Sequence, residues 1–193
     1  MSIEVEQSLR GEKMSEADNP KASVDVPAKG AFSVNDMCTP EHFLLISVRD
    51  WVNSVKQKQS PIPRLARAFK IAQISAGLRS LDAFMLLTAT TAIRALDIRC
   101  PKCSGIGAGE IDVLSTVAFI QAQKSEWAYQ RLLGWLPPAS ARRALADVEA
   151  LALQMATAEL RIPLRLEYMG LDLANVSDDR NVVVTFPIHK TVQ

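Results

Sequence analysis

Cysteine, histidine and aromatic residues are scarce in this chain of 193 residues, which has three cysteines, two histidines and 6% aromatic residues. Three cysteines do not make a disulfide framework, so we expect a reducing, cytoplasmic environment rather than secretion. The first thirty residues are polar and acidic. They contain no apolar stretch of the kind found in signal peptides, which favours the same compartment.

Long hydrophobic runs are also absent. The longest uncharged apolar stretch, Ala83–Ile93, has eleven residues. A membrane-spanning helix needs roughly 20. We therefore expect no membrane span, and we predict that this stretch is a buried helix at the centre of a globular core.

Common catalytic motifs are missing too. The sequence contains no G-x-S-x-G, H-E-x-x-H or P-loop pattern. Of the two histidines, His42 lies at the start of a predicted helix and His189 lies near the C-terminal end. The paired carboxylates Glu110 and Asp112 fit the first turn of a helix, where negative charge is favoured. We predict no catalytic residues, expect that the protein is not an enzyme, and expect no cofactor.

The formal net charge is only +1, but the charges are unevenly distributed. Residues 1–42 carry a net charge of −4, residues 43–102 carry +7 and residues 103–193 carry −2. Residues 1–36 have few large apolar side chains and no aromatic residue before Phe32. Such a segment cannot bury enough surface to offset its ordering entropy, so we predict a disordered acidic tail over 1–36. It is either a passive tail or a recognition or export segment.

The remaining chain, residues 37–193, has the apolar periodicity of helices up to about Pro163. Six helices are expected: from Thr39 to the break at KQKQSPIP, from about Pro63 to Ala76 with Gly77 as C-cap, from Ser80 to about Arg99, from about Ala108 to Gln123, from Ser125 to WLPP, and from Ser140 to before Pro163. Short connections of this kind are typical of an antiparallel helical bundle. The pattern then alternates in PLRLEYMG and in NVVVTFP, which predicts a small C-terminal β hairpin over about 164–187. The fold class is therefore mainly α with a C-terminal hairpin.

The stretch IRCPKCSGIGAGEIDVL between the third and fourth predicted helices contains a CxxC pair, Cys100 and Cys103. Together with Cys38 and His42 it would complete a Cys₃His set for a structural zinc ion. The alternative is a simple turn, in which the glycines let the chain reverse direction before the next helix. A redox role is disfavoured, because Cys100 is expected just after a helix C-terminus, where the dipole opposes a thiolate.

The segment Cys100–Gly107 reads CxxCxGxG, which resembles one repeat of the zinc domain of the DnaJ-type cochaperones. That family uses several repeats, two for each zinc ion. This chain contains one and lacks the family's J-domain motif, so no function is implied. Phosphate binding is also disfavoured, because Glu110 and Asp112 would repel an anion at the start of the next helix.

The positive middle block places Arg64, Arg67, Lys70 and Arg79 on two successive predicted helices. We interpret these residues as an exposed basic face for an acidic protein partner, including the chain's own acidic tail. The segment is similar to a helix-turn-helix in having small residues before a tight turn. A nucleic-acid-associated regulator is therefore an alternative, although the second helix would be too apolar to read bases.

The segment WAYQRLLGWLPP is dense in aromatic residues, and Trp127 or Trp135 is predicted to lie at a partner surface, because tryptophan is favoured at binding hot spots. The sequence thus predicts a non-enzymatic, adaptor-like interaction or regulatory protein. A zinc-stabilised accessory factor is a further alternative.

Overall fold

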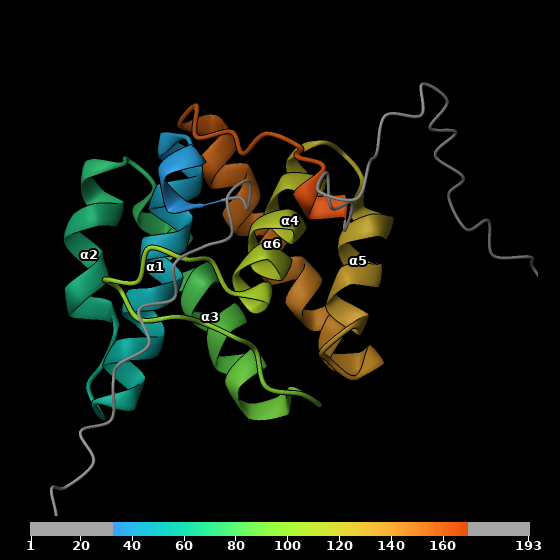
Figure 1. The fold of residues 1–193 in the computed structure, drawn as a ribbon, viewed down its shortest axis with the longest axis horizontal. Helices are drawn as coiled ribbons and strands as arrows, with labels where there is room; N and C mark the ends of the chain where they lie inside the picture. The colour runs from blue at the N-terminus through green and yellow to red at the C-terminus, as the bar shows by residue number, and fades with distance from the viewer. Residues whose placement is uncertain (1–32, 170–193) are drawn as a thin grey trace, which may run out of the picture.

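The computed structural model describes residues 33–169, which form six α-helices and two short 3-10 helices, with no β-strand in that range. The α-helices are α1 (Thr39–Lys56), α2 (Ile62–Ile71), α3 (Ser75–Thr91), α4 (Ala108–Gln121), α5 (Ser125–Leu133) and α6 (Pro138–Thr157). The 3-10 helices are η1 (Val34–Asp36) and η2 (Glu167–Met169). Figure 1 shows α2 and α5 at opposite ends of the domain, with the other helices between them. The prediction of a mainly helical fold is confirmed.

Helix α4 is the central element of the domain. Ten of its fourteen residues are buried, and it packs against α1, α5, α6 and η2. The buried hydroxyls of Ser115 and Thr116 both donate to the carbonyl oxygen of Asp112 in their own helix. Because these polar groups are satisfied within the helix, α4 tolerates burial on nearly every side.

The expectation that Ala83–Ile93 forms the centre of the core is wrong, because only three of its eleven residues are buried and five are exposed. Phe84 and Met85 are buried, but the side chain of Leu86 is 55% exposed and that of Ile93 is 68% exposed. The buried positions of α3 recur at helical spacing along one face, so α3 covers the core instead of running through it. None of the helices in residues 33–169 is long and apolar enough to cross a membrane.

Helices α3 and α6 run antiparallel and pack closely. Near the start of α3, a Cβ added to Gly77 would lie 3.3 Å from Leu151 Cδ1 and 3.5 Å from Gln154 Cβ. Just after the end of α3, the backbone N–H of Ile93 donates to the carbonyl oxygen of Trp135, which precedes α6. Gly77 therefore lies within the first turns of α3 and permits close helix packing, where the sequence had predicted a C-cap of the preceding helix.

Two other predicted helix ends also differ from the structure. Helix α2 ends at Ile71 instead of Ala76, because Gln73 has a left-handed backbone with a φ of 60°. Helix α3 ends at Thr91 instead of about Arg99, so residues 92–107 form a long irregular connection. Helix α1 begins at Thr39, as predicted, and its N-cap is Cys38.

The predicted hairpin lies mostly outside the described residues, which end at Met169. The described part of its first strand, Leu164–Met169, contains no strand and ends in η2. Tyr168 is fully buried there, and its hydroxyl donates to Glu41 at the start of α1. Most of the predicted acidic tail, residues 1–32, is likewise outside the described range, whereas residues 34–36 form η1.

Four helix ends share one backbone motif. Each has a non-glycine residue with a φ of 57° to 60°, namely Lys58, Gln73, Gln123 or Glu159. The residue that follows donates its N–H back to a carbonyl oxygen in the last turn, as Lys124 does to Phe119 over 2.8 Å. This is the Schellman arrangement, in which glycine avoids the steric cost of about 1–2 kcal/mol that other residues incur in the left-handed region.

Replacing Gln123 with glycine should therefore stabilise the domain. We expect the free energy of unfolding, measured by urea denaturation, to rise by about 0.5–1 kcal/mol for Gln123→Gly, because the steric relief exceeds the entropy of the more flexible unfolded chain. Ala122→Gly is the matched control, since Ala122 has a φ of −85°. It should lower the free energy of unfolding, and equal changes in the two variants would contradict the assignment.

Candidate functional site

The connection between α3 and α4 carries the two cysteines of the CxxC pair, which form a disulfide. The backbone N–H of Cys103 donates to the carbonyl oxygen of Cys100 over 3.0 Å, and Lys102 is exposed at the tip of this turn. The sequence analysis expected reduced cysteines. The structure instead shows a disulfide, because the turn brings the two Cα atoms to 5.3 Å, within disulfide range. Helix α3 ends nine residues before Cys100, so the predicted effect of its dipole on Cys100 does not apply.

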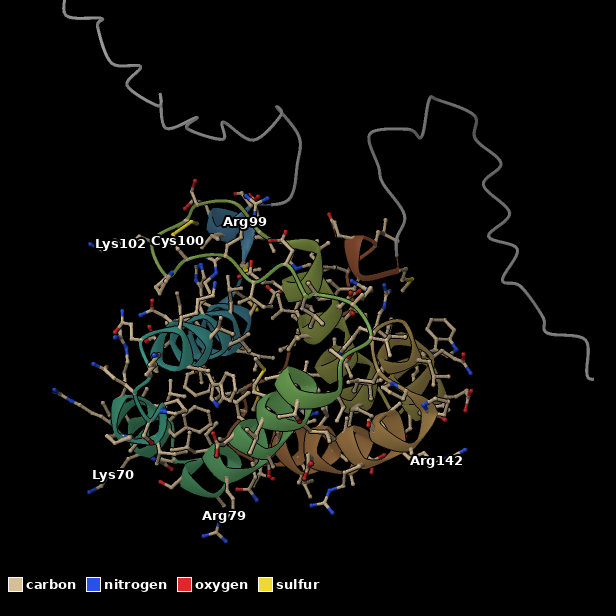
Figure 2. The ribbon with its side chains drawn as sticks, turned by 90° about the horizontal axis from the view of Figure 1, so that it is seen from below. Lys70, Arg79, Arg99, Cys100, Lys102 and Arg142 are labelled. Atoms are coloured by element: carbon tan, nitrogen blue, oxygen red, sulfur yellow. A yellow bond between two sulfur atoms is a disulfide. The ribbon has the colours of Figure 1, made fainter. Side chains whose placement is uncertain are left out.

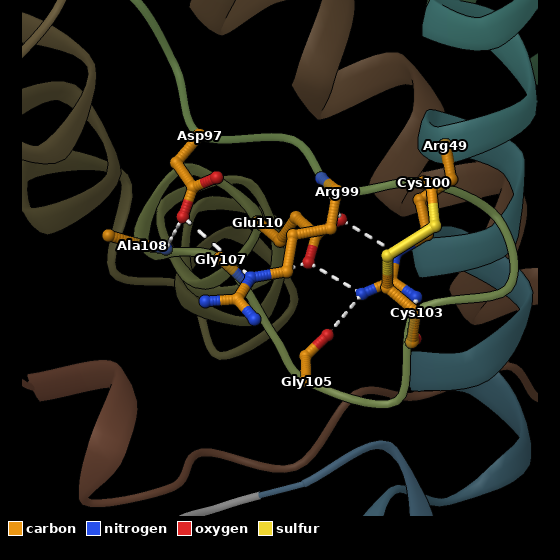
Figure 3. Close-up of polar contacts among 9 residues, drawn as sticks. All are labelled: Arg49, Asp97, Arg99, Cys100, Cys103, Gly105, Gly107, Ala108 and Glu110. Atoms are coloured by element: carbon orange, nitrogen blue, oxygen red, sulfur yellow. Dashed lines mark hydrogen bonds and ion pairs between the residues drawn. A yellow bond between two sulfur atoms is a disulfide. The ribbon is translucent and has the colours of Figure 1, made fainter. Parts of the chain in front are cut away.

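A buried ion pair lies directly beneath this turn. Arg49 of α1 and Glu110 of α4 form two hydrogen bonds, from Nε to Oε1 over 2.7 Å and from Nη2 to Oε2 over 2.8 Å. The side chain of Arg49 is 1% exposed and that of Glu110 is fully buried. Arg49 also donates to the carbonyl oxygens of Cys103, over 2.6 Å, and of Gly105, over 2.7 Å (Figure 3).

Glu110 completes the same network from the other side. Its carboxylate accepts hydrogen bonds from the backbone N–H groups of Gly107, over 2.8 Å, and of Arg99, over 3.0 Å. The contact with Gly107 caps the start of α4, as the carboxylate of a capping box does. One buried carboxylate therefore fixes the helix end, the loop before it and the guanidinium of Arg49.

Two glycines of the loop are required by close packing. A Cβ on Gly107 would lie 2.3 Å from the carbonyl oxygen of Asp97, and a Cβ on Gly109 would lie 2.8 Å from the backbone nitrogen of Asp97. Both distances are too short for any side chain. The predicted turn between two helices is present, but these glycines serve close backbone approach, whereas the sequence analysis assigned them freedom to reverse the chain.

The structure does not bring the four predicted zinc ligands together. Cys100 and Cys103 are bonded to each other, and Cys38 is a free, partly buried thiol whose pKa is raised by burial. His42 lies one turn along α1, where its backbone N–H donates to the carbonyl oxygen of Cys38. Among residues 33–169, no three His, Cys, Asp or Glu residues form a group that could hold a metal ion. A zinc site that uses Cys38, His42 and the reduced forms of Cys100 and Cys103 stays a prediction.

A second buried carboxylate, Glu41, links α1 to the segment after α6. Arg165 donates to both carboxylate oxygens of Glu41, over 2.6 and 2.7 Å, and the Tyr168 hydroxyl and the Cys38 backbone N–H also donate to it. Burial raises the pKa of Glu41, but the hydrogen bonds outweigh burial and hold its pKa below the usual value. Burial and the hydrogen bond to Glu41 raise the pKa of Tyr168.

The four predicted basic residues are all exposed. Arg64, Arg67 and Lys70 lie on α2, and Arg79 lies on α3, which packs against α2. Figure 2 shows Lys70 and Arg79 pointing away from the domain on the side opposite the Cys100–Lys102 turn, and Arg142 of α6 also points outward there. Arg64 pairs with Asp50 of α1 over 3.0 Å. The sequence therefore identified the four exposed cations of α2 and α3.

The two predicted surface tryptophans differ in position. Trp135 is fully buried, so the expectation that it lies on a contact surface is wrong. It follows α5 directly and is enclosed in the hydrophobic core. Trp127 is partly exposed on α5, where its ring contacts Phe119 edge-on and the Lys124 ammonium lies 4.7 Å from the ring centre.

Comparisons with known proteins identify no relative of this chain. No protein-family model matches it, and neither a curated protein nor a solved structure does.

Removing one partner of the Arg49–Glu110 pair should strongly destabilise the domain. We expect Arg49→Met or Glu110→Gln to lower the free energy of unfolding by about 3–5 kcal/mol, because the remaining group is left buried without its partner. The double variant should lose less than the sum of the single losses. Arg64→Met is the control, since it removes an exposed ion pair worth about 0–1 kcal/mol. Additive losses in the double variant would contradict direct coupling.

The Glu41–Arg165 contact should make stability depend on pH. Because the pKa of Glu41 is lowered in the folded state, its contribution is complete above the unfolded-state pKa of about 4.3 and is lost as the pH falls through the folded-state pKa. Arg165→Met should lower the free energy of unfolding at pH 7 by about 2–3 kcal/mol. Urea denaturation should show this difference shrinking below about pH 4. Arg161→Met, at an exposed position, should leave the pH profile unchanged. A difference that is constant with pH would contradict the proposed ionisation.

Proposed function

We propose that this chain is a non-enzymatic interaction or regulatory protein that binds an acidic protein partner through a basic face. The face consists of Arg64, Arg67, Lys70 and Arg79 on the packed helices α2 and α3. The observation that carries the proposal is that all four cations are exposed and that three of them have no carboxylate partner within residues 33–169.

The charge on this face is available for binding. Arg67, Lys70 and Arg79 make no ion pair with any described residue, and Arg64 shares its charge with Asp50. Arginine side chains recognise carboxylates through a planar pair of hydrogen bonds, and such pairs give an interface orientation and specificity. An acidic surface or peptide would therefore fit the face electrostatically.

An exposed apolar side chain adds to the same face. Ile71 directly follows Lys70 at the end of α2 and is 72% exposed. Interfaces gain most of their free energy from a few well-packed apolar and arginine side chains within a polar rim. This combination favours a partner that presents both carboxylates and an apolar side chain.

The exposed side of α3 supports a protein partner over a nucleic acid. The sequence analysis expected this helix to be buried and too apolar to read bases, but the structure exposes one face of it. That face contains Leu86 and Thr90 in addition to Arg79. Base edges are read by Arg, Lys, Asn and Gln side chains, and this face has one of them near its start. A nucleic-acid-associated role remains the alternative that the experiment below distinguishes.

The placement of the acidic residues supports a non-enzymatic role. Glu41 and Glu110 are fully buried and hold arginine side chains and backbone N–H groups. A substrate cannot contact carboxylates that are enclosed in this way. Their positions are accounted for by the packing of α1, α4 and the segment after α6.

Charge reversal should test this proposal. We expect Arg67→Glu/Lys70→Glu to reduce capture of the partner by at least about tenfold, because two favourable contacts become repulsive. Capture would be measured by affinity purification from cells with quantitative mass spectrometry, before and after nuclease digestion.

The control is Lys102→Glu/Arg161→Glu, which makes the same change in net charge at exposed positions away from α2 and α3. It should capture the partner as the unaltered chain does. Equal loss in both variants would contradict a specific face. Loss of capture on nuclease digestion, together with duplex affinity that falls steeply with salt, would favour the nucleic-acid alternative.

A further inference from the structure

A cavity of about 320 Å³ lies between α1, α3 and the irregular segment that follows α3. Its wall contains Trp51 and Val52 of α1, Met85 and Ala89 of α3, and Leu96 and Ile98 of the connection. The Trp51 indole is held in place because its N–H donates to Asp82 over 2.7 Å. The cavity is separate from the basic face, none of whose four residues lines it.

The charged residues of this cavity are of one sign. Lys56 and Arg94 line it, and no aspartate or glutamate does. Arg94 is already engaged by Asp112, over 2.9 Å, and by the carbonyl oxygen of Gly134, over 2.8 Å. Lys56, at the end of α1, makes no ion pair with any residue in the range 33–169. Its ammonium is therefore the group available to an anion at an otherwise apolar wall.

A buried hydroxyl on the same wall lacks a partner. Thr88 lines the cavity and is 5% exposed, and its Oγ1 has no hydrogen-bond partner among the described residues. A buried polar group without a partner costs about 1–3 kcal/mol. Oγ1 is covered by its neighbours in this conformation. The wall therefore contains one unsatisfied hydroxyl beside its apolar side chains.

We propose that this cavity binds a small anionic amphiphile, with its apolar part against Trp51 and Met85 and its carboxylate near Lys56. Apolar walls with a few polar groups are typical of small-molecule sites. The volume accommodates on the order of ten non-hydrogen atoms at about 30 Å³ each, the share of a water molecule in the liquid. A medium-chain carboxylic acid has this size and charge.

The test uses octanoate as the probe, with octanol and octylammonium as the neutral and cationic analogues. Isothermal titration should give one saturable site for octanoate, with a dissociation constant in the range of about 0.1–1 mM expected for a ligand of this size. Octanol should bind about fivefold more weakly because it lacks the charge, and octylammonium weaker still. Equal affinity for octanoate and octanol would overturn the proposal.

Two variants locate the site. Lys56→Met should weaken octanoate binding about fivefold and leave octanol binding unchanged, whereas Lys70→Met, away from the cavity, should change neither. Ala89→Phe should abolish binding of both probes by filling the cavity, with Ala92→Leu as a second filling variant if the first proves unfolded by circular dichroism. Octanoate binding unaffected by a folded filling variant would overturn the site. So would binding to anionic phospholipid vesicles without saturable binding of octanoate.

Discussion

The ion pair between Arg49 and Glu110 is the interaction on which the arrangement of this domain depends. A charged pair enclosed in this way is stable only when the remaining hydrogen-bonding groups of both partners are also satisfied. Here the Arg49 guanidinium also donates hydrogen bonds to two carbonyl oxygens of the loop, and the Glu110 carboxylate accepts hydrogen bonds from two backbone N–H groups. The irregular segment before α4 packs Leu96, Ile98 and Ile106 against the core, and the ion pair fixes the part of this segment that lies between Arg99 and Gly107.

Two other carboxylates in the first turns of helices are also paired with arginine side chains. Glu41 at the start of α1 holds Arg165 and Tyr168 from the other end of the described chain. Asp112, one turn into α4, holds Arg94 and Arg131 over 2.9 and 3.3 Å. Each carboxylate lies near the positive end of a helix and is paired with an arginine distant in sequence. Apolar packing joins the six helices, and these polar contacts link α1 and α5 to α4 and attach the non-helical segments to the helices.

The surfaces proposed for function depend on side chains that these internal ion pairs do not engage. The arginines at positions 49, 94, 131 and 165 are engaged within the domain, whereas the cations of α2 and the start of α3 face outward. The cavity beside Trp51 exists because α3 ends at Thr91 and the chain then leaves the helical path, which exposes the side of α1 to a loop instead of a helix. The basic face and the cavity are separate features and can be tested independently.

Periodicity and capping are local properties of the chain, so they were enough to predict the helical class, the approximate positions of six helices and the exposed cations of α2 and α3. The sequence analysis placed Ala83–Ile93 at the centre because this stretch is uncharged, whereas α4 contains Glu110 and Asp112. Only the folded structure shows that arginines from other segments pair with these two carboxylates and let α4 be buried. Nor could the sequence by itself pair Arg49 with Glu110 or Glu41 with Arg165. Such pairs depend on which helix ends meet in space, and the tertiary structure alone decides that.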